Sequence, residues 1–255
     1  MHDFFSSLHP NLTAGYALLF LGVAVIQGMS KAGLSGFSLV AIPVMAIIFG
    51  AKESTGILLP MLLTADIMAV IYYRKNAVWK HIFRVLPWVA AGIFTALIVG
   101  NRINAGQFRL LLLSVTWLML ILLILNDFWK RKNQVIPENH FFAAPMGFTG
   151  GFATMIGNAS GPVFTLYFLA MKLPKKEFIG TGAWLFLIIN ASKLPLHLYV
   201  WETISTRTLM LDLIAIPFIA AGIYAGIHIV KLFPEKAYRL FVIFTTLVTS
   251  VLLFL

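Results

Sequence analysis

Long apolar runs, separated by short polar segments, constrain this 255-residue chain more than any other feature of its sequence. Ten such runs lie at about 13–29, 36–49, 54–73, 84–100, 108–126, 141–156, 159–171, 178–200, 208–230 and 237–255. A helix of about 20 residues crosses the hydrocarbon core of a bilayer, and most of the runs approach this length. A hydrophobic fraction of 60% with only 11% charged residues excludes an ordinary soluble domain. The sequence therefore predicts an all-α integral membrane protein.

The formal net charge of +10 has to be read by location, because an excess of basic residues also occurs in nucleic-acid-binding proteins. The loops on one predicted side carry Lys31, Arg74, Lys75, Lys80, Arg84, Lys130, Arg131, Lys132, Lys172, Lys175, Lys176, Lys231, Lys236 and Arg239. The other side carries Lys52, Arg102, Arg109 and Arg207, and Lys193 lies inside a run. Basic loops of membrane proteins stay in the cytoplasm, which places both termini outside. The charge thus predicts topology, with a lipid bilayer rather than nucleic acid as partner.

Several kinds of chemistry lack their usual residues in this sequence. The chain has no cysteine, which excludes disulfides, thiolate catalysis and iron–sulfur clusters. Its six histidines do not have the spacing of metal ligands, and a Walker motif is absent. An intramembrane enzyme is therefore the least favoured function, and we expect no cofactor and no metal.

The sequence also contains an internal repeat. Residues 87–93 (PWVAAGI) match residues 217–223 (PFIAAGI) at an offset of 130. At an offset of 124, Gly33 matches Gly157, residues 52–53 match 176–177, Gly56 matches Gly180, and Asp66 matches Asn190. Each half holds five runs, and an odd number of crossings inverts the second half relative to the first. We therefore expect a first transmembrane repeat at 13–126, a cytoplasmic linker at 127–140 and a second, inverted repeat at 141–255.

Two glycine-rich segments, 27–38 and 147–162, occupy matching places in the halves. The apolar arms beside them are short, which indicates short or re-entrant helices with a bend at membrane depth. Irregular backbone at that depth is buried in protein or lines a wet cavity, and helix starts there attract anions. The predicted substrate-binding residues are Ser30, Lys31, Gly33, Ser35, Gly36, Ser38, Thr154, Gly157, Asn158, Ser160 and Gly161. Two alternatives stay open: the small residues serve helix packing, and Lys31 is an ordinary loop charge.

Three polar residues lie deep inside long runs, namely Asp66, Asn190 and Lys193. A charge in the bilayer centre is costly, so each should face a partner or water. Asp66 and Lys193 have opposite charges and lie on equivalent runs, so they are candidates for a pair. We interpret Asp66 as a proton-coupling residue, because burial disfavours an ionised carboxylate, and Asn190 and Lys193 as anion-binding residues. The alternatives are a structural ion pair or a lysine that extends to the interface.

These features together resemble the sulfite exporter TauE/SafE family, of the four-toluene-sulfonate uptake type. The resemblance rests on residues 28–43 with the later 52–56 in the first half, and on 147–162 with 176–181 in the second. This sequence departs from the glycine-dense family pattern at 29–32 (MSKA) and 158–160 (NAS). The resemblance implies movement of sulfite, organosulfonates or other small organic anions across the bacterial cytoplasmic membrane.

The residues and the resemblance lead to one main hypothesis, a secondary transporter of a small anion that works by alternating access. Proton coupling is part of this hypothesis. A passive anion channel is the alternative, since it would use the same sequence features. A homodimer is left open, and the sequence does not decide the direction of transport.

Overall fold

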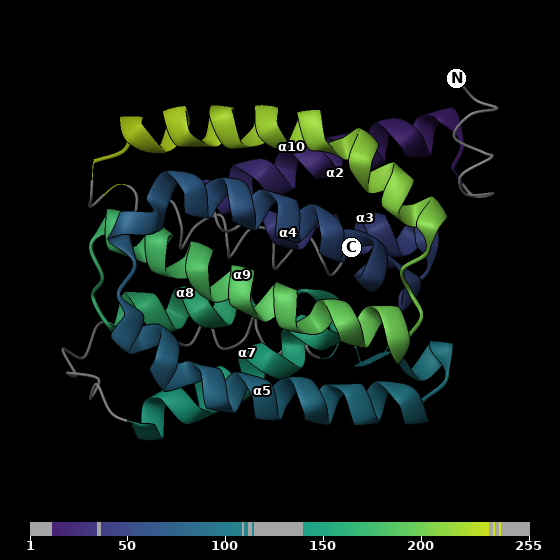
Figure 1. Cartoon of the computed structure of the whole chain (residues 1–255), viewed down its shortest axis with the longest axis horizontal. Helices are drawn as coiled ribbons and strands as arrows, with labels where there is room; N and C mark the ends of the chain where they lie inside the picture. Colours follow the sequence, from purple (N-terminus) through teal and green to yellow (C-terminus); the bar gives the residue numbers. More distant parts are fainter. Residues whose placement is uncertain are drawn as a thin grey trace.

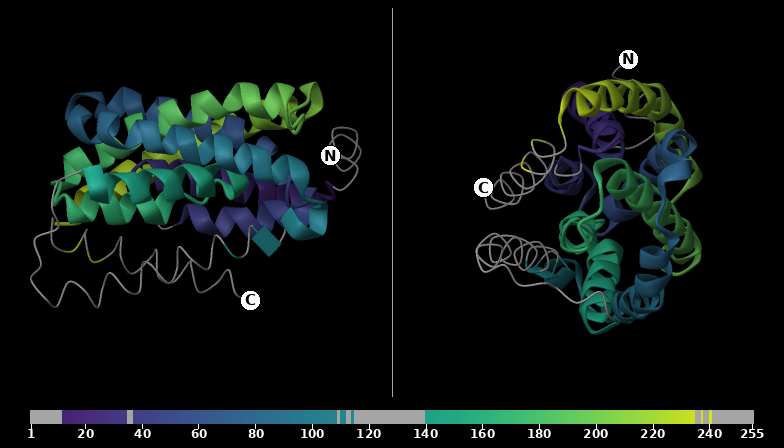
Figure 2. Two further views of the ribbon diagram at one scale, coloured as in Figure 1. Left: turned by 90° about the horizontal axis from the view of Figure 1, so that it is seen from below. Right: turned by 90° about the vertical axis from the view of Figure 1, so that its left-hand side faces the viewer.

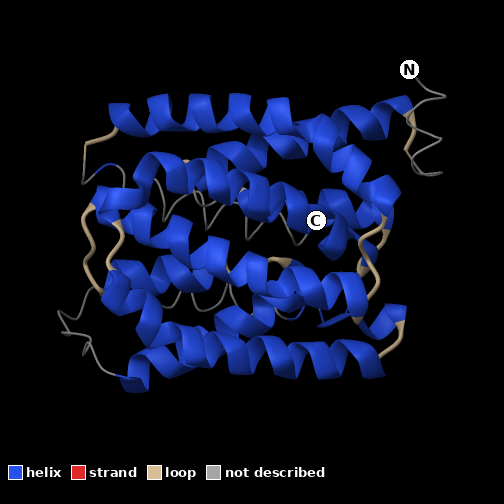
Figure 3. Ribbon diagram, viewed as in Figure 1, coloured by secondary structure: helices blue, strands red, loops and turns tan. Residues whose placement is uncertain are grey.

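The computed structural model describes residues 12–34, 37–108, 110–111, 114, 140–234, 237 and 240. Its main elements are α2 (Ala14–Lys31), α3 (Ser38–Phe49), α4 (Glu53–Tyr73), η1 (Arg74–Asn76), α5 (Trp79–Arg102), α7 (His140–Gly157), α8 (Gly161–Ala170), α9 (Lys175–Tyr199) and α10 (Thr206–Leu232). Within these residues the secondary structure is helical, as Figure 3 shows, and no strand occurs. The predicted all-α class is confirmed.

Four of the described helices are long and apolar enough to cross a membrane: α4 with η1, α5, α9 and α10. Their outward faces carry large apolar side chains such as Phe83, Phe94 and Leu213, as expected of surfaces in contact with lipid. The shorter α2, α3 and α8 are also apolar. The predicted runs at 108–126 and 237–255 lie largely outside the described residues, as does most of the predicted linker at 127–140.

The short helices form two hairpins. In the first, Phe20 of α2 contacts Phe49, the last residue of α3, with 6.0 Å between the ring centroids. In the second, Phe142 near the start of α7 stacks on Tyr167 near the end of α8, also at 6.0 Å. Each pair of helices therefore doubles back, so that its bend is the glycine-rich segment identified in the sequence. This geometry agrees with the expected short or re-entrant helices.

Each hairpin packs mainly on a long helix from the other half of the sequence: α7 on α5, and α2 on α10. Glycines make these contacts close. A Cβ built on Gly92 of α5 would overlap the carbonyl of Phe148 in α7, and one on Gly222 of α10 would overlap the carbonyl of Val25 in α2. Small residues let helix backbones approach in membranes, so these glycines serve packing.

Most basic side chains of the described residues gather at one end of the helix bundle, which we call the basic end. There α4 and α10 finish and α9 begins, on the left in Figure 1. Thr181 of α9 accepts a hydrogen bond from the Val78 N–H at 2.9 Å, and the Lys175 ammonium donates to the Phe233 carbonyl at 2.6 Å. The opposite end holds Lys52, whose ammonium lies 5.1 Å from the Trp201 ring centroid.

The two hairpins open toward different ends of this bundle. The open end of the first hairpin is at Phe49, close in sequence to Lys52 at the opposite end of the bundle. The open end of the second is at Ala170, just before α9 begins at the basic end. Seen along the helices in Figure 2, α4 and α9 lie between the two hairpins and connect them. Their contact is the most extensive among helices outside the two hairpin–helix pairs.

Candidate anion site

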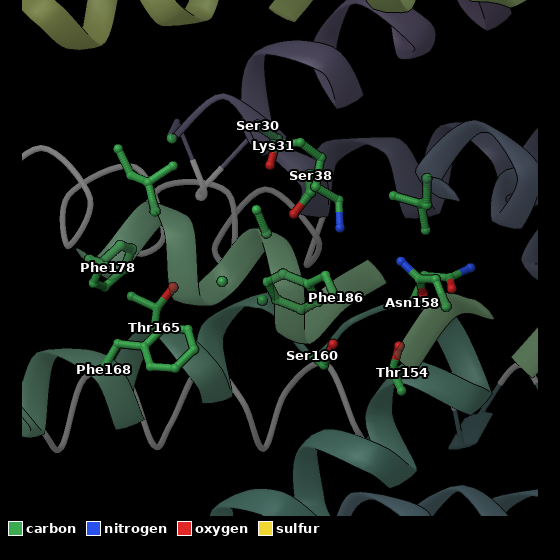
Figure 4. A pocket seen from close by; sticks show the side chains of 17 residues that line it. Ser30, Lys31, Ser38, Thr154, Asn158, Ser160, Thr165, Phe168, Phe178 and Phe186 are labelled. Carbon is green, nitrogen blue, oxygen red and sulfur yellow. The ribbon is translucent and has the colours of Figure 1, made fainter. Parts of the chain in front are cut away.

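The bends of both hairpins meet at one central cavity. Figure 4 shows polar side chains from both bends facing this space. The first hairpin contributes Ser30, Lys31, Gly33 and Ser38, and the second contributes Thr154, Asn158, Ser160 and Gly161. Thr165 of α8 and Asn190 of α9 add two further polar groups. Two segments more than 100 residues apart in sequence therefore build a single pocket.

The local backbone explains why these residues sit at the bends. Gly33 has a φ of +123°, which side chains disfavour, and Asn158 adopts a left-handed φ of +55°. Each follows the first helix of its hairpin, Gly33 two residues after the end of α2 and Asn158 directly after the end of α7. The chain then restarts as α3 at Ser38 and as α8 at Gly161, with no side-chain cap at either start. An uncapped helix start exposes backbone N–H groups, and the start of α8 at Gly161 borders the cavity.

Lys31, Asp66 and Asn190 form a chain of contacts beside the cavity. The Lys31 ammonium lies 2.8 Å from Asp66 Oδ1, and the Asn190 amide donates to Asp66 Oδ2 at 2.6 Å. Asp66 is completely buried, whereas the Lys31 side chain is 10% exposed and lines the cavity. The same ammonium stands 4.1 Å above the Phe186 ring. Lys31 is therefore a mostly buried ion-pair partner of Asp66, which favours a site residue over an ordinary loop charge.

Lys193 has a different set of partners from the one that its charge suggested. Its ammonium donates to the Thr154 carbonyl at 3.0 Å, to Thr154 Oγ1 at 3.0 Å and to Asn158 Oδ1 at 2.6 Å. The expected pair between Asp66 and Lys193 is therefore replaced by Asp66 with Lys31. The side chain is fully buried, and its three N–H donors meet three neutral acceptors. Lys193 is thus held by neutral acceptors, and no carboxylate is bound to it.

Asn158 lies on the cavity wall and is hydrogen-bonded at both ends of its side-chain amide. Its oxygen accepts from Lys193, and its amide nitrogen donates to the Thr55 carbonyl at 3.0 Å. Both ends of the amide are held, so its orientation is fixed. Thr55 lies in the first turn of α4, so the contact ties the second hairpin to a helix of the first half.

The cavity is small, and much of its wall is apolar. The space open to the centre of a water molecule measures about 60 Å³. A single water needs about 10–15 Å³ on this measure, so the cavity holds a ligand of a few heavy atoms. Leu62, Phe168, Phe178, Ile179 and Phe186 provide much of the apolar wall. Sequence reasoning missed these residues, because apolar side chains are too common in this chain to mark a site.

Nearly all described residues of the predicted site lie at or beside this cavity. Asn190 lines the wall, Lys193 binds two wall residues, and Asp66 binds Lys31 and Asn190. Gly157 is buried directly before the Asn158 bend. Ser35 and Gly36 lie outside the described residues. The structure places these residues together, while their role in binding stays a prediction.

Comparison with known families identifies a match to this chain. The family model described as Sulfite exporter TauE/SafE matches residues 17–253, which is nearly the whole chain. Searches of the curated proteins and of the solved structures found no match.

Proposed function

Because the chain belongs to the sulfite exporter TauE/SafE family, a family of membrane transporters of sulfur anions, we propose that it is a secondary transporter of sulfite or a small organosulfonate. The observation that carries this proposal is the single cavity between the two hairpin bends, with Lys31 on its wall. A sulfonate group has three oxygens around one sulfur, and its negative charge suits ammonium, hydroxyl and backbone N–H donors. The volume of about 60 Å³ favours a small anion over a large one.

Each group in the site has a proposed task. Lys31 contacts the anion directly, and the backbone at the start of α8 donates further hydrogen bonds. Lys193 acts at longer range, because Thr154 and Asn158 separate its ammonium from the cavity. Low-dielectric surroundings strengthen the attraction of a fixed charge, so a fully buried lysine contributes to anion binding without touching the anion. The apolar wall accommodates the organic part of a sulfonate.

We propose that protons couple to transport through Asp66. In the ionised form Asp66 holds the Lys31 ammonium at 2.8 Å, so an arriving anion competes with the carboxylate for the same cation. A proton on Asp66 removes this competitor and frees Lys31 for the anion. The proton and the anion then occupy the site together, and the two are transported across the membrane together.

Two inverted repeats account for the alternating access that such a carrier needs. Asp66 and Asn190 match at the sequence offset of 124, and they are also joined by a hydrogen bond. Equivalent residues of a two-fold arrangement can touch each other only near the axis. We therefore place the axis between α4 and α9 at this contact. The opposite openings of the two hairpins support the same assignment.

The same arrangement supports an orientation in the cytoplasmic membrane. The basic end carries Arg74, Lys75, Lys80, Lys176 and Lys231, and basic loops are retained in the cytoplasm. We therefore assign the basic end to the cytoplasm and both termini to the outside. The repeat boundaries of 13–126 and 141–255 and a homodimeric state remain predictions. Side-specific protease cleavage of tagged termini in intact cells tests the orientation.

Transport is tested by reconstitution into liposomes with a labelled panel of sulfite, methanesulfonate and other small organic anions. The proposal expects saturable uptake of at least one sulfur anion, stimulated by an inwardly directed proton gradient. A conductive current that does not saturate and ignores the proton gradient would instead establish the anion channel. Absence of uptake for the whole panel, with correctly folded protein in the liposomes, would refute both functions.

A further inference from the structure

A second hollow, which we call the vestibule, lies at the basic end. The described residues that line it are Tyr72, Tyr73, Asn76, Lys175, Lys176, Ile179, Val230 and Lys231. Three of these are lysines and none is acidic, although Glu177 follows Lys176 in the sequence. The space open to the centre of a water molecule is about 450 Å³, much larger than the central cavity. The vestibule is therefore a roomy, positively charged hollow.

The three lysines have different contacts. Lys175 donates to the carbonyls of Val230 at 3.1 Å and Phe233 at 2.6 Å, so it holds the end of α10 in place. The Lys231 ammonium lies 5.6 Å from the Tyr72 ring centroid, and its side chain is exposed. Lys176 is exposed as well. Lys175 thus has a structural contact with the end of α10, whereas Lys176 and Lys231 are exposed at the vestibule.

A thin wall separates the vestibule from the central cavity. Ile179 lines both spaces. A Cβ built on Gly33 would lie 2.8 Å from Ile179 Cδ1 and 3.2 Å from Val230 Cγ2, so these side chains press against the Gly33 backbone. Tyr73 of the vestibule donates a hydrogen bond to the Ala32 carbonyl at 3.2 Å. The bend of the first hairpin and the Ile179 side chain therefore separate the vestibule from the central cavity.

We infer that the vestibule is a second anion site, at which the transported sulfonate or sulfite collects before it passes Ile179. This inference rests on the proposed transport function and adds to it a separate, low-affinity site at the basic end. A concave surface of one charge sign raises the local concentration of oppositely charged ligands. The anion exchanges water for the lysine ammonium groups there, and it reaches Lys31 when Ile179 moves aside.

Because the chain has no cysteine, one introduced thiol can report on the vestibule. The variant Lys176→Cys is reconstituted into liposomes of phosphatidylcholine, which carry no net charge. Before reconstitution, its thiol is modified in detergent solution with a positively or a negatively charged methanethiosulfonate of similar size. The variant Arg207→Cys provides the matched control, because Arg207 is exposed at the opposite end. Uptake of labelled methanesulfonate is then measured at low and at saturating concentration.

The inference expects the positive adduct at position 176 to restore uptake and the negative adduct to lower it, by about threefold or more at low substrate concentration. The maximal rate should change little, and salt at about 1 M should abolish the difference, because it screens charges beyond about 3 Å. Equal rates with the two adducts, or the same difference at position 207, would overturn the inference. Uptake by the unmodified protein tests the transport function separately.

A second measurement requires no transport. The vestibule should accelerate modification of Lys176→Cys by the negative reagent relative to a neutral one, and methanesulfonate should slow that reaction in competition. At Arg207→Cys the two reagents should differ less, and methanesulfonate should have no effect. If methanesulfonate fails to protect position 176 at any concentration, the vestibule does not bind the anion.

Discussion

Replacement of Asp66 by asparagine tests the proposed competition for Lys31 most directly. The substitution preserves the size of the side chain but removes the negative charge that lies 2.8 Å from the Lys31 ammonium. An anion bound to the far side of that ammonium would stand about 6 Å from the carboxylate, and with an effective dielectric constant of about 20 their repulsion is about 3 kcal/mol. Since about 1.4 kcal/mol corresponds to a tenfold change, the variant should bind the anion up to about 100-fold more tightly.

The assay is equilibrium binding of labelled methanesulfonate to purified protein between about pH 5 and pH 8. Sulfonates remain ionised over this range, so a change in binding reports on the protein alone. In the original protein, binding should tighten as the pH falls, because protonation of Asp66 removes the same repulsion. In Asp66→Asn the affinity should be high and independent of pH, and uptake should no longer respond to a proton gradient.

Asp212→Asn is the matched control, since Asp212 is also a buried carboxylate, but the ion pair with Lys31 is formed by Asp66. It should leave both the affinity and its pH dependence unchanged. The reasoning is refuted if Asp66→Asn binds methanesulfonate no more tightly than the original protein. It is refuted equally if the pH dependence of binding survives in that variant.

Substitutions at three further sites, with their controls, have defined expectations. Lys193→Met should weaken methanesulfonate binding by about 10- to 100-fold, because it removes a buried charge near the cavity; an unchanged binding isotherm would assign Lys193 a structural role only. Asn158→Gly should keep the left-handed bend but lose the amide, so binding should weaken while the unfolding temperature falls less than in Asn158→Val. Gly92→Ala should destabilise the protein by about 1–3 kcal/mol, because its Cβ overlaps the Phe148 carbonyl. Gly22→Ala, where nothing lies within 4 Å, should be neutral or stabilising in the same thermal unfolding series.

The helices and many of the polar residues around the central cavity were predictable from sequence, because both leave strong contrasts in an apolar chain. Gly33 and Asn158 interrupt long hydrophobic runs, and the structure places both at the edge of one cavity. The offset of 124 also matched Asp66 to Asn190, although it did not predict that they touch.

The partner of Asp66 was not predictable in the same way. Charge and helix equivalence favoured Lys193, but the choice depends on how far the first hairpin reaches into the bundle. That depth is set by packing of α2 on α10, and it brings Lys31 to Asp66. Tertiary packing of this kind leaves no local pattern. For the same reason the aromatic wall, with Phe178 and Phe186, could not be recognised in advance.

The packing of α2 on α10, a helix of the other half, has a consequence for the order in which the protein folds during translation. The first hairpin leaves the ribosome early, but Gly222, against which Val25 packs, is translated almost 200 residues later. During that interval the bend at Gly33 lacks its contact with Val230. Irregular backbone is costly in lipid without protein cover, so the first hairpin reaches its final depth only after α10 has inserted. We therefore expect the central cavity to be completed late, after α10 has been inserted into the membrane.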